Sequence, residues 1–220
     1  VVATCRGPVE SLDNLWQLRD QHGERLHLYT LDVESETSIR EAYNQAATKF
    51  RTFDRIINVA GILHDGDLTP EKRLTDISPE HFEKVMRVNT LGPLLVAKWF
   101  SALMSKEEQS QYINISARVG SISDNYLGGW YSYRASKAAL NMITRNLSIE
   151  LKRKLPKVIC AAIHPGTTDT GLSKPFQRNV PASRLSTSLE TAVKILGVMD
   201  GLDYHHNGSF LSADGVPIPW

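Results

Sequence analysis

Short apolar runs alternate with longer helical patterns along the whole sequence, and this alternation limits the possible folds more than any other feature. Strands separated by helices of about ten or more residues form βαβ units, whose parallel sheet has helices on both faces. Because crossovers between parallel strands are right-handed, the order predicts a doubly wound, Rossmann-type α/β fold. The apolar runs are residues 1–5, 26–31, 55–59, 112–115, 158–163 and 209–211. The first helical pattern is the stretch with Leu12, Leu15, Trp16 and Leu18. The later helical patterns are residues 39–50, 79–86, 90–104, 131–151 and 189–199.

The sequence shows no internal repeat, low-complexity tract or linker, so we expect one domain over residues 1–220. This length is usual for a single α/β domain. Two helix starts are marked by capping signals, Ser35 or Thr37 before residue 39 and Ser78 before Pro79. The least periodic stretch is residues 166–188, and long connections of this kind often act as lids over a site.

Charge and cysteine content exclude several classes of function. The chain has 25 basic and 24 acidic residues, so its net charge of +1 is too small to recruit nucleic acid or an anionic membrane. Cys5 and Cys160 are too few for a disulfide framework and lack metal-ligand spacing. No apolar run reaches the roughly 20 residues of a transmembrane helix. We expect a metal-free protein of the cytoplasm or of an organelle stroma or matrix, and a targeting segment upstream of Val1 remains open.

Tyr133 and Lys137 form the feature most suggestive of chemistry. Residues four apart share one face of a helix, so the lysine ammonium comes near the tyrosine phenol. A nearby positive charge favours phenolate and is expected to lower the tyrosine pKa from about 10, which would allow proton exchange with a carbonyl or alcohol oxygen. Taken alone, the spacing is more typical of a partly buried tyrosine beside a solvated lysine.

Three other segments stand at predicted strand ends or on an adjacent helix, where ligands bind in open α/β sheets. The run 56–61 is a strand that ends in Asn58, Ala60 and Gly61, and its small residues let a flat ligand approach the backbone. Asn89 interrupts a helical pattern, although asparagine is a poor residue inside a helix. The run 163–170 passes through Pro-Gly into a turn rich in hydroxyl groups.

Together these segments resemble the short-chain dehydrogenase/reductase family over essentially the whole chain. The matching motifs are Asp32-Val33, Asn58-Val59-Ala60-Gly61, Asn89, Asn114-Ile115-Ser116, Tyr133-x-x-x-Lys137 and Pro165-Gly166 with Thr170. Within the family, the tail from Gly208 to Trp220 and the run Trp130-Tyr131-Ser132-Tyr133-Arg134 resemble the C-factor and sniffer-like carbonyl reductase branch.

The resemblance implies a role for each motif. Tyr133 would be the acid/base toward the substrate oxygen, Lys137 would bind the nicotinamide ribose hydroxyls, and Asn89 would hold a relay water through a local helix distortion. The remaining positions would bind the cofactor: Asp32 and Val33 at the adenine, Asn58, Ala60 and Gly61 along the adenosine, and residues 163–170, including Pro165, Gly166, Thr168 and Thr170, at the nicotinamide end. Family members also commonly pair through the helices at 90–104 and 131–151, which predicts a homodimer.

The sequence departs from the family pattern at two places. The family's first strand and its glycine-rich phosphate loop are absent from the residues before Arg6, and we interpret this as an N-terminal truncation. The family's catalytic serine also falls on Ala117. Ser116 is our preferred replacement, Ser121 is the second candidate, and the absence of any serine donor is the third. Arg118 lies close to this position and is expected to be a solvent-facing loop residue.

Arg6 bears on the choice of cofactor. It follows the first visible strand, where an acidic residue would bind the ribose 2′-hydroxyl of NAD, whereas an arginine suits the 2′-phosphate of NADP(H). We therefore expect an NADP-dependent oxidoreductase acting on an aldehyde, ketone or quinone, or on the corresponding alcohol. The alternative is a cofactor-binding sensor or signalling protein of the same fold with weak or no catalysis, which Ala117 and the missing loop would favour.

Overall fold

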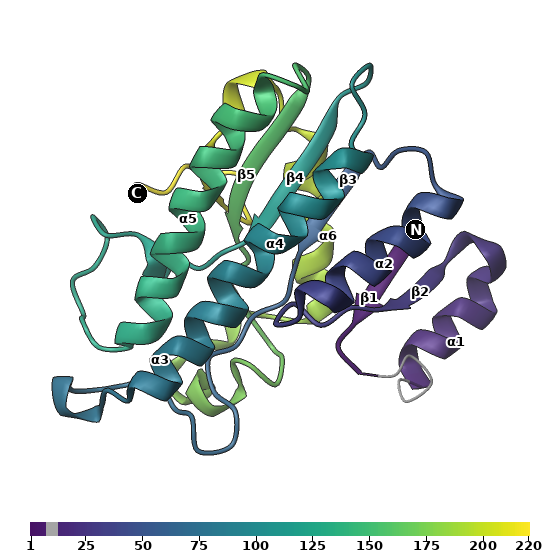
Figure 1. Cartoon of the computed structure of the whole chain (residues 1–220). Helices are drawn as coiled ribbons and strands as arrows, with labels where there is room; N and C mark the ends of the chain where they lie inside the picture. Colours follow the sequence, from purple (N-terminus) through teal and green to yellow (C-terminus); the bar gives the residue numbers. More distant parts are fainter. Residues whose placement is uncertain (8–12) are drawn as a thin grey trace.

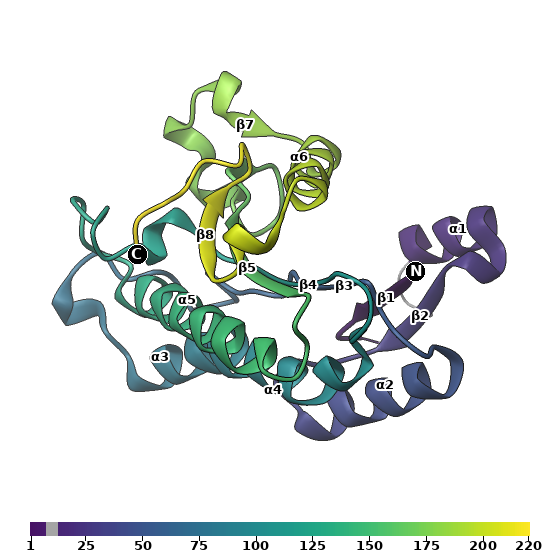
Figure 2. The ribbon, with the colours of Figure 1, turned by 90° about the horizontal axis from the view of Figure 1, so that it is seen from above.

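The computed structural model describes residues 1–7 and 13–220, and it confirms the α/β fold with parallel strands. The strands lie between two layers of helices (Figures 1 and 2), as the predicted βαβ order requires. The main strands are β1 (Val2–Cys5), β2 (His27–Thr30), β3 (Arg55–Asn58), β4 (Ser110–Ile115), β5 (Val158–His164) and β8 (Ser209–Ser212). The ends of each strand lie within two residues of the ends of the run predicted for it. Leu12, from the first helical pattern, falls outside the described residues.

The parallel strands form two separate ladders. The larger has the order β3-β4-β5-β8, and the smaller pairs β1 with β2 in the register Val2 to His27. No backbone ladder joins β1 to β3 within residues 1–7 and 13–220. Within the described residues, β1 and β3 therefore each have one edge without a hydrogen-bonded neighbour strand, while the α/β arrangement remains the one predicted.

Helices cover both faces of the strands. One layer contains α2 (Glu36–Lys49), α3 (Pro79–Met86), α4 (Gly92–Phe100) and α5 (Tyr131–Lys152), and the other contains α1 (Asp13–His22) and α6 (Ser188–Asp200) (Figure 2). The predicted caps are present: the Ser35 side chain accepts from the Ser38 N–H, and the Ser78 side chain accepts from the His81 N–H. No helix in the described part of the chain is both long enough and apolar enough to cross a bilayer.

The predicted helices at 79–86 and 90–104 are joined into one helical path. A π-helical turn, Arg87–Leu91, connects α3 to α4, and the α-helix ends at Phe100 rather than near Met104. Such turns place one extra residue in the helix and often occur at functional sites. Asn89 lies at the centre of this turn, where the sequence predicts a local distortion.

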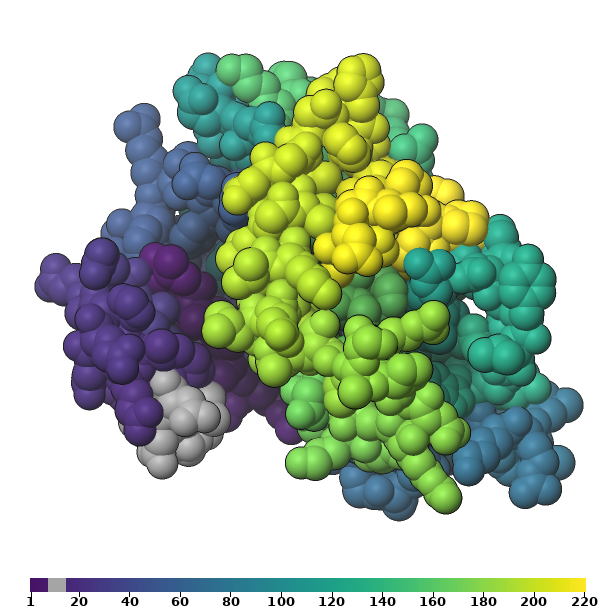
Figure 3. Space-filling view, turned by 180° about the vertical axis from the view of Figure 1, so that it is seen from behind, coloured from purple at the N-terminus to yellow at the C-terminus, as the bar shows by residue number. Residues whose placement is uncertain are grey.

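The connection 166–188 is more ordered than the sequence indicates. It contains two short parallel strands, β6 (Thr167–Thr168) and β7 (Leu185–Ser186), with the short 3₁₀ helices Lys174–Asn179 and Ala182–Arg184 between them. Seen from behind, α6 lies between the N-terminal elements and the C-terminal tail, and this connection lies below the tail (Figure 3). The tail is fixed by stacking of the Phe210 and Trp220 rings, whose centroids are 5.5 Å apart.

Candidate active site

Helix α5 carries the two residues at the centre of the predicted chemistry. It packs against β5 and against the turn Arg118–Gly120, which places its first turns beside the carboxyl ends of β4 and β5. Tyr133 and Lys137 are 8% and 4% exposed, and the Lys137 Nζ lies 5.8 Å from the centre of the Tyr133 ring. The structure therefore brings this pair together in a buried site, as the helical spacing predicts.

The expected lowering of the Tyr133 pKa is not what the structure shows. Burial raises the pKa of Tyr133 to about 12, because removal from water disfavours the phenolate. The ammonium of Lys137 lies over the ring and donates to the Ile115 carbonyl at 3.0 Å. Desolvation thus outweighs the lysine charge, and Tyr133 is a neutral phenol near pH 7.

Lys137 has the surroundings of a group that binds hydroxyls. Burial lowers its pKa to about 8, so the ammonium still predominates at neutral pH. An ammonium has three donors, and the bond to Ile115 is its single hydrogen bond to the described residues. A Cβ on the exposed Gly61 would lie 3.6 Å from Lys137 Nζ. The remaining donor capacity of Lys137, beside the exposed Gly61, therefore fits the binding of ribose hydroxyls.

Asn89 is buried in the π-helical turn and uses its whole amide. Its Oδ1 accepts from Ile62 N at 2.7 Å, and its Nδ2 donates to Ile62 O at 2.8 Å and to Ser136 Oγ at 3.0 Å. Ser136 Oγ in turn donates to the Tyr133 carbonyl. Asn89 therefore ties the loop after β3 to the same face of α5 that carries Tyr133.

Both serine candidates are buried and hydrogen-bonded. Ser116 Oγ donates to Asn141 Oδ1 at 2.6 Å, whereas Ser121 Oγ donates to the Pro219 carbonyl at 2.5 Å. Ala117 precedes the turn that carries Arg118, and Arg118 pairs with Asp124 at 3.1 Å on the surface, as expected for a loop arginine. Which serine, if either, faces a substrate stays a prediction.

The positions predicted at the adenine and adenosine lie at or just after the ends of β3 and β2, which belong to different ladders. The Asn58 amide donates to Tyr112 Oη and Asn114 Oδ1, both at 2.8 Å, so it also joins β3 to β4. Ala60 and Gly61 follow it as exposed backbone. After β2, Asp32 Oδ1 accepts from the Glu34 N–H at 2.9 Å, which forms a tight turn at the partly buried Val33.

Arg6 is exposed directly after β1, at the same end of the strands. A 2.7 Å hydrogen bond from Lys84 lowers the pKa of the Asp65 carboxyl, and the Arg6 charge adds to this lowering. The guanidinium therefore lies near the loop that follows β3. The hydrogen bond to Asp65 raises the pKa of Lys84 and the Arg6 charge opposes this rise, so Arg6 is near the Lys84–Asp65 pair.

The residues predicted at the nicotinamide end follow β5. Pro165 is partly buried, and Gly166 adopts a φ of +78°, a left-handed conformation that favours glycine. Thr168 Oγ1 is 2.9 Å from Thr191 Oγ1 on α6, and the Thr170 N–H donates to Ser173 Oγ at 3.4 Å. Hydroxyl contacts within the turn and with α6 therefore hold it in place.

Sequence reasoning missed one polar residue of this region, Asn141, and gave another, His164, no individual role. Asn141 follows Lys137 by four residues, so the helical spacing that joins Tyr133 to Lys137 could have indicated it. His164 ends β5 with a buried Nδ1 that has no hydrogen-bond partner among the described residues. Burial, with the nearby Arg118 charge, lowers the pKa of His164 to about 4, so its ring is neutral. His164 lies within the predicted run 163–170, but nothing in the sequence distinguished it from the other residues of that run.

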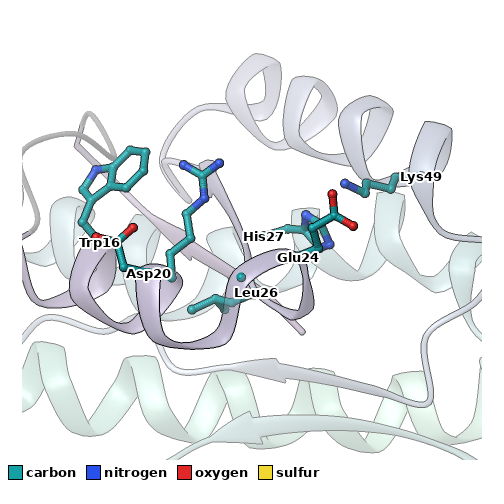
Figure 4. A pocket seen from close by; sticks show the side chains of 8 residues that line it. Trp16, Asp20, Glu24, Leu26, His27 and Lys49 are labelled. Carbon is teal, nitrogen blue, oxygen red and sulfur yellow. The ribbon is translucent and has the colours of Figure 1, made fainter.

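A cavity of about 510 Å³ lies elsewhere on the molecule (Figure 4). Its lining comes from α1, the turn Gly23–Arg25, β2 and the end of α2, with Arg19 stacked 4.5 Å from the Trp16 ring centre. The cavity contains none of the predicted site residues. We therefore base the candidate site on the cluster around Tyr133.

Comparisons with known proteins agree with this geometry. The family model described as short chain dehydrogenase matches residues 1–181. The C-signal protein of Myxococcus xanthus is 31% identical over 147 residues, covering 67% of this chain and 83% of that protein. An uncharacterized oxidoreductase of Schizosaccharomyces pombe is 30% identical over 232 residues, covering 100% of this chain and 87% of that protein.

Two solved structures have the same fold. The NADPH-bound carbonyl reductase from chicken fatty liver is 30% identical with a TM-score of 0.87, and the carbonyl reductase Sniffer of D. melanogaster is 25% identical with a TM-score of 0.86. Each match covers 100% of this chain and 87% of the other. With its parallel strands and its Tyr133–Lys137 pair, the chain belongs to the short-chain dehydrogenase family of oxidoreductases.

Proposed function

We propose that this protein is an NADP(H)-dependent reductase that interconverts a carbonyl, in an aldehyde, ketone or quinone, with the corresponding alcohol. The observation that carries the proposal is the buried pairing of Tyr133 with Lys137 beside Gly61. The likeness to carbonyl reductases from chicken and fly, the first of them bound to NADPH, supports the same activity.

The side chains have complementary tasks in the proposed reaction. When bound, the nicotinamide cofactor supplies a hydride to the carbonyl carbon. The neutral phenol of Tyr133 gives its proton to the carbonyl oxygen, so that the carbonyl is reduced to an alcohol. Lys137 holds the ribose hydroxyls and places a positive charge near the resulting phenolate, which its cationic form stabilises.

The remaining predicted residues hold the cofactor. In this proposal, residues 1–220 form one dinucleotide-binding domain. Arg6 binds the 2′-phosphate, and Asp32 and Val33 flank the adenine. The other proposed cofactor-binding residues are Asn58, Ala60, Gly61, Pro165, Gly166, Thr168 and Thr170.

Cofactor preference tests this assignment. A hydrogen bond to a charged group is worth about 1.5–3 kcal/mol, so we expect kcat/KM for NADPH to exceed that for NADH by about tenfold or more. Arg6→Asp should reverse the preference, because the carboxylate repels the phosphate and accepts from a ribose hydroxyl. The matched control is Arg51→Asp, an exposed arginine that follows α2. Equal use of both cofactors by the unmodified protein would contradict the role of Arg6.

The second candidate is a cofactor-binding sensor of the same fold. It is favoured by Ala117 at the family's serine position and by the existing hydrogen bonds of Ser116 and Ser121. NADPH binding detected by fluorescence, with no cofactor oxidation across a broad panel of carbonyl compounds, would support the sensor over the reductase.

A further inference from the structure

Helix α5 begins without a cap from its own sequence. The first N–H groups of a helix have no partners within the helix and need acceptors from elsewhere. The N-cap position of α5 is occupied by Trp130, whose indole can donate but not accept a hydrogen bond. Trp130 also has a φ of 51°, a left-handed conformation that is unusual for a bulky residue. Something outside the helix must therefore hold this turn in place.

Glu71, from a loop 61 residues earlier in the chain, supplies the missing acceptors. Its side chain is buried, and Oε2 accepts from the Ser132 N–H at 3.2 Å while Oε1 accepts from the Ser132 hydroxyl. Its backbone carbonyl accepts from the Trp130 N–H at 2.5 Å. A Cβ on Gly129, which has a φ of +64°, would lie 3.4 Å from the same carbonyl. Glu71 therefore holds the chain on both sides of the position where the helix starts.

The loop that carries Glu71 is itself fixed. Asp65 and Leu68 exchange two backbone hydrogen bonds of 3.0 Å, and the Leu68 side chain is buried in an apolar cluster. On the other side, the Arg73 N–H donates to Asp76 Oδ2 at 3.0 Å. Because the loop is anchored before and after Glu71, the carboxylate provides a rigid support for the helix.

We infer that Glu71 is a positioning residue for the acid/base Tyr133, and this inference rests on the proposed reductase function. Tyr133 directly follows Ser132, so the two bonds from Ser132 to Glu71 set where the first turn of α5, and with it the phenol, lies. The Trp130 ring meets the Tyr133 ring at 6.2 Å in an edge-to-face contact, which the same clamp maintains. A carboxylate at a helix N-terminus is also favoured by the helix dipole.

Loss of this clamp should affect turnover more than cofactor binding. Displacement of a reacting group by about 1 Å can cost on the order of 10²-fold in rate, whereas Lys137 lies one turn further along α5 and is held by Ile115. We expect Glu71→Ala to lower kcat by about tenfold or more and to change the KM for NADPH by less than about threefold. Glu71→Gln keeps one acceptor oxygen and should recover part of the loss.

The control is Glu80→Ala. Glu80 is another acidic residue at a helix start and accepts from the Ser78 hydroxyl at 2.6 Å, but it is exposed and belongs to α3. Amide hydrogen exchange of residues 131–136 gives a readout that does not depend on activity. Protection should fall there in Glu71→Ala and stay unchanged in Glu80→Ala. If Glu71→Ala does not fold, Ser132→Ala, which removes one of the two bonds, and Glu71→Gln carry the same test.

The outcomes separate this proposal from the function on which it rests. Unchanged kcat in Glu71→Ala, or an equal fall in Glu80→Ala, would overturn the positioning role, as would unchanged protection of residues 131–136. A protein that oxidises no NADPH with any carbonyl would refute the reductase function, whereas loss of protection in Glu71→Ala would still support the clamp on α5.

Discussion

At the scale of single residues, burial fixes the protonation states of Tyr133 and Lys137. It raises the pKa of the phenol to about 12 and lowers that of the ammonium to about 8. Both shifts have the same cause, since burial disfavours the charged form of either group. The result at neutral pH is a neutral acid beside a cation, which suits the direction of carbonyl reduction.

The Lys137 pKa predicts how carbonyl reduction depends on pH. The charged form of Lys137 is the active one, so kcat/KM for reduction should be level below about pH 8 and fall as pH rises through that value, because kcat/KM reports pKa values of the free enzyme. The measurement is the rate of NADPH oxidation from about pH 6 to about pH 10. A Lys137→Arg variant, which stays charged, should lose the decline, and a level profile in the unmodified protein would contradict the prediction.

Substitution of each serine tests which hydroxyl assists the reaction. We predict that Ser116→Ala lowers kcat/KM on one reducible carbonyl by about 10²–10³, the usual cost of losing a donor to a developing oxyanion. To reach the substrate, the Ser116 hydroxyl must give up its hydrogen bond to Asn141. The Ser121 hydroxyl is bonded to the Pro219 carbonyl. A large loss only in Ser121→Ala would contradict this choice. Loss in neither, with higher activity in Ala117→Ser, would show that the reaction proceeds without a serine donor.

The sequence predicts the central residues of the site but not the residues that support them. Tyr133 and Lys137 could be found because they share one helix, where spacing determines which side chains meet. Glu71 acts on α5 from a separate loop, and the buried Nδ1 of His164 depends on tertiary packing. Contacts between distant segments leave no periodic signal in a single sequence.

At the scale of elements, the π-helical turn between α3 and α4 connects the loop after β3 to α5. Periodicity places the limits of α3 correctly at Pro79 and Met86, because capping and amphipathic spacing are local. The extra residue in the turn at Asn89 was expected only as a distortion. Its form depends on bonds to Ile62 and Ser136, which local patterns do not encode.

Removal of the Asn89 amide should therefore destabilise the protein. Asn89→Ala leaves buried groups of Ile62 without partners, and each such group costs about 1–3 kcal/mol. We expect the free energy of unfolding in urea to fall by at least about 2 kcal/mol, with a matched control in Thr48→Ala, whose hydroxyl bond is exposed. A change below about 0.5 kcal/mol would show that Asn89 does not hold this turn.

At the scale of the whole molecule, α4 and α5 lie in the same helical layer (Figure 2). Both helices also expose apolar side chains. Leu94 is 39% exposed on α4, and Met142 and Ile149 are 62% and 48% exposed on α5. These are the helices through which the sequence predicts a homodimer. Exposed apolar side chains on two neighbouring helices fit an interface of that kind.

Light scattering tests the predicted dimer. We expect the mass of two chains at about micromolar concentration, and Met142→Glu should shift it toward one chain because it places a charge in the interface. Leu127→Glu is the control, since Leu127 is 92% exposed on a loop outside both helices. A monomeric mass for the unmodified protein would contradict the prediction.

The central claim is that Tyr133 supplies the proton in an NADPH-dependent reduction, and Tyr133→Phe tests it most directly. The variant keeps the ring and removes the donor, so kcat should fall by about 10²-fold or more, as expected for loss of general acid catalysis, while the NADPH dissociation constant changes little. Tyr131→Phe, two residues earlier on α5 and 40% exposed, is the matched control and should retain full activity. Undiminished turnover by Tyr133→Phe would contradict the account.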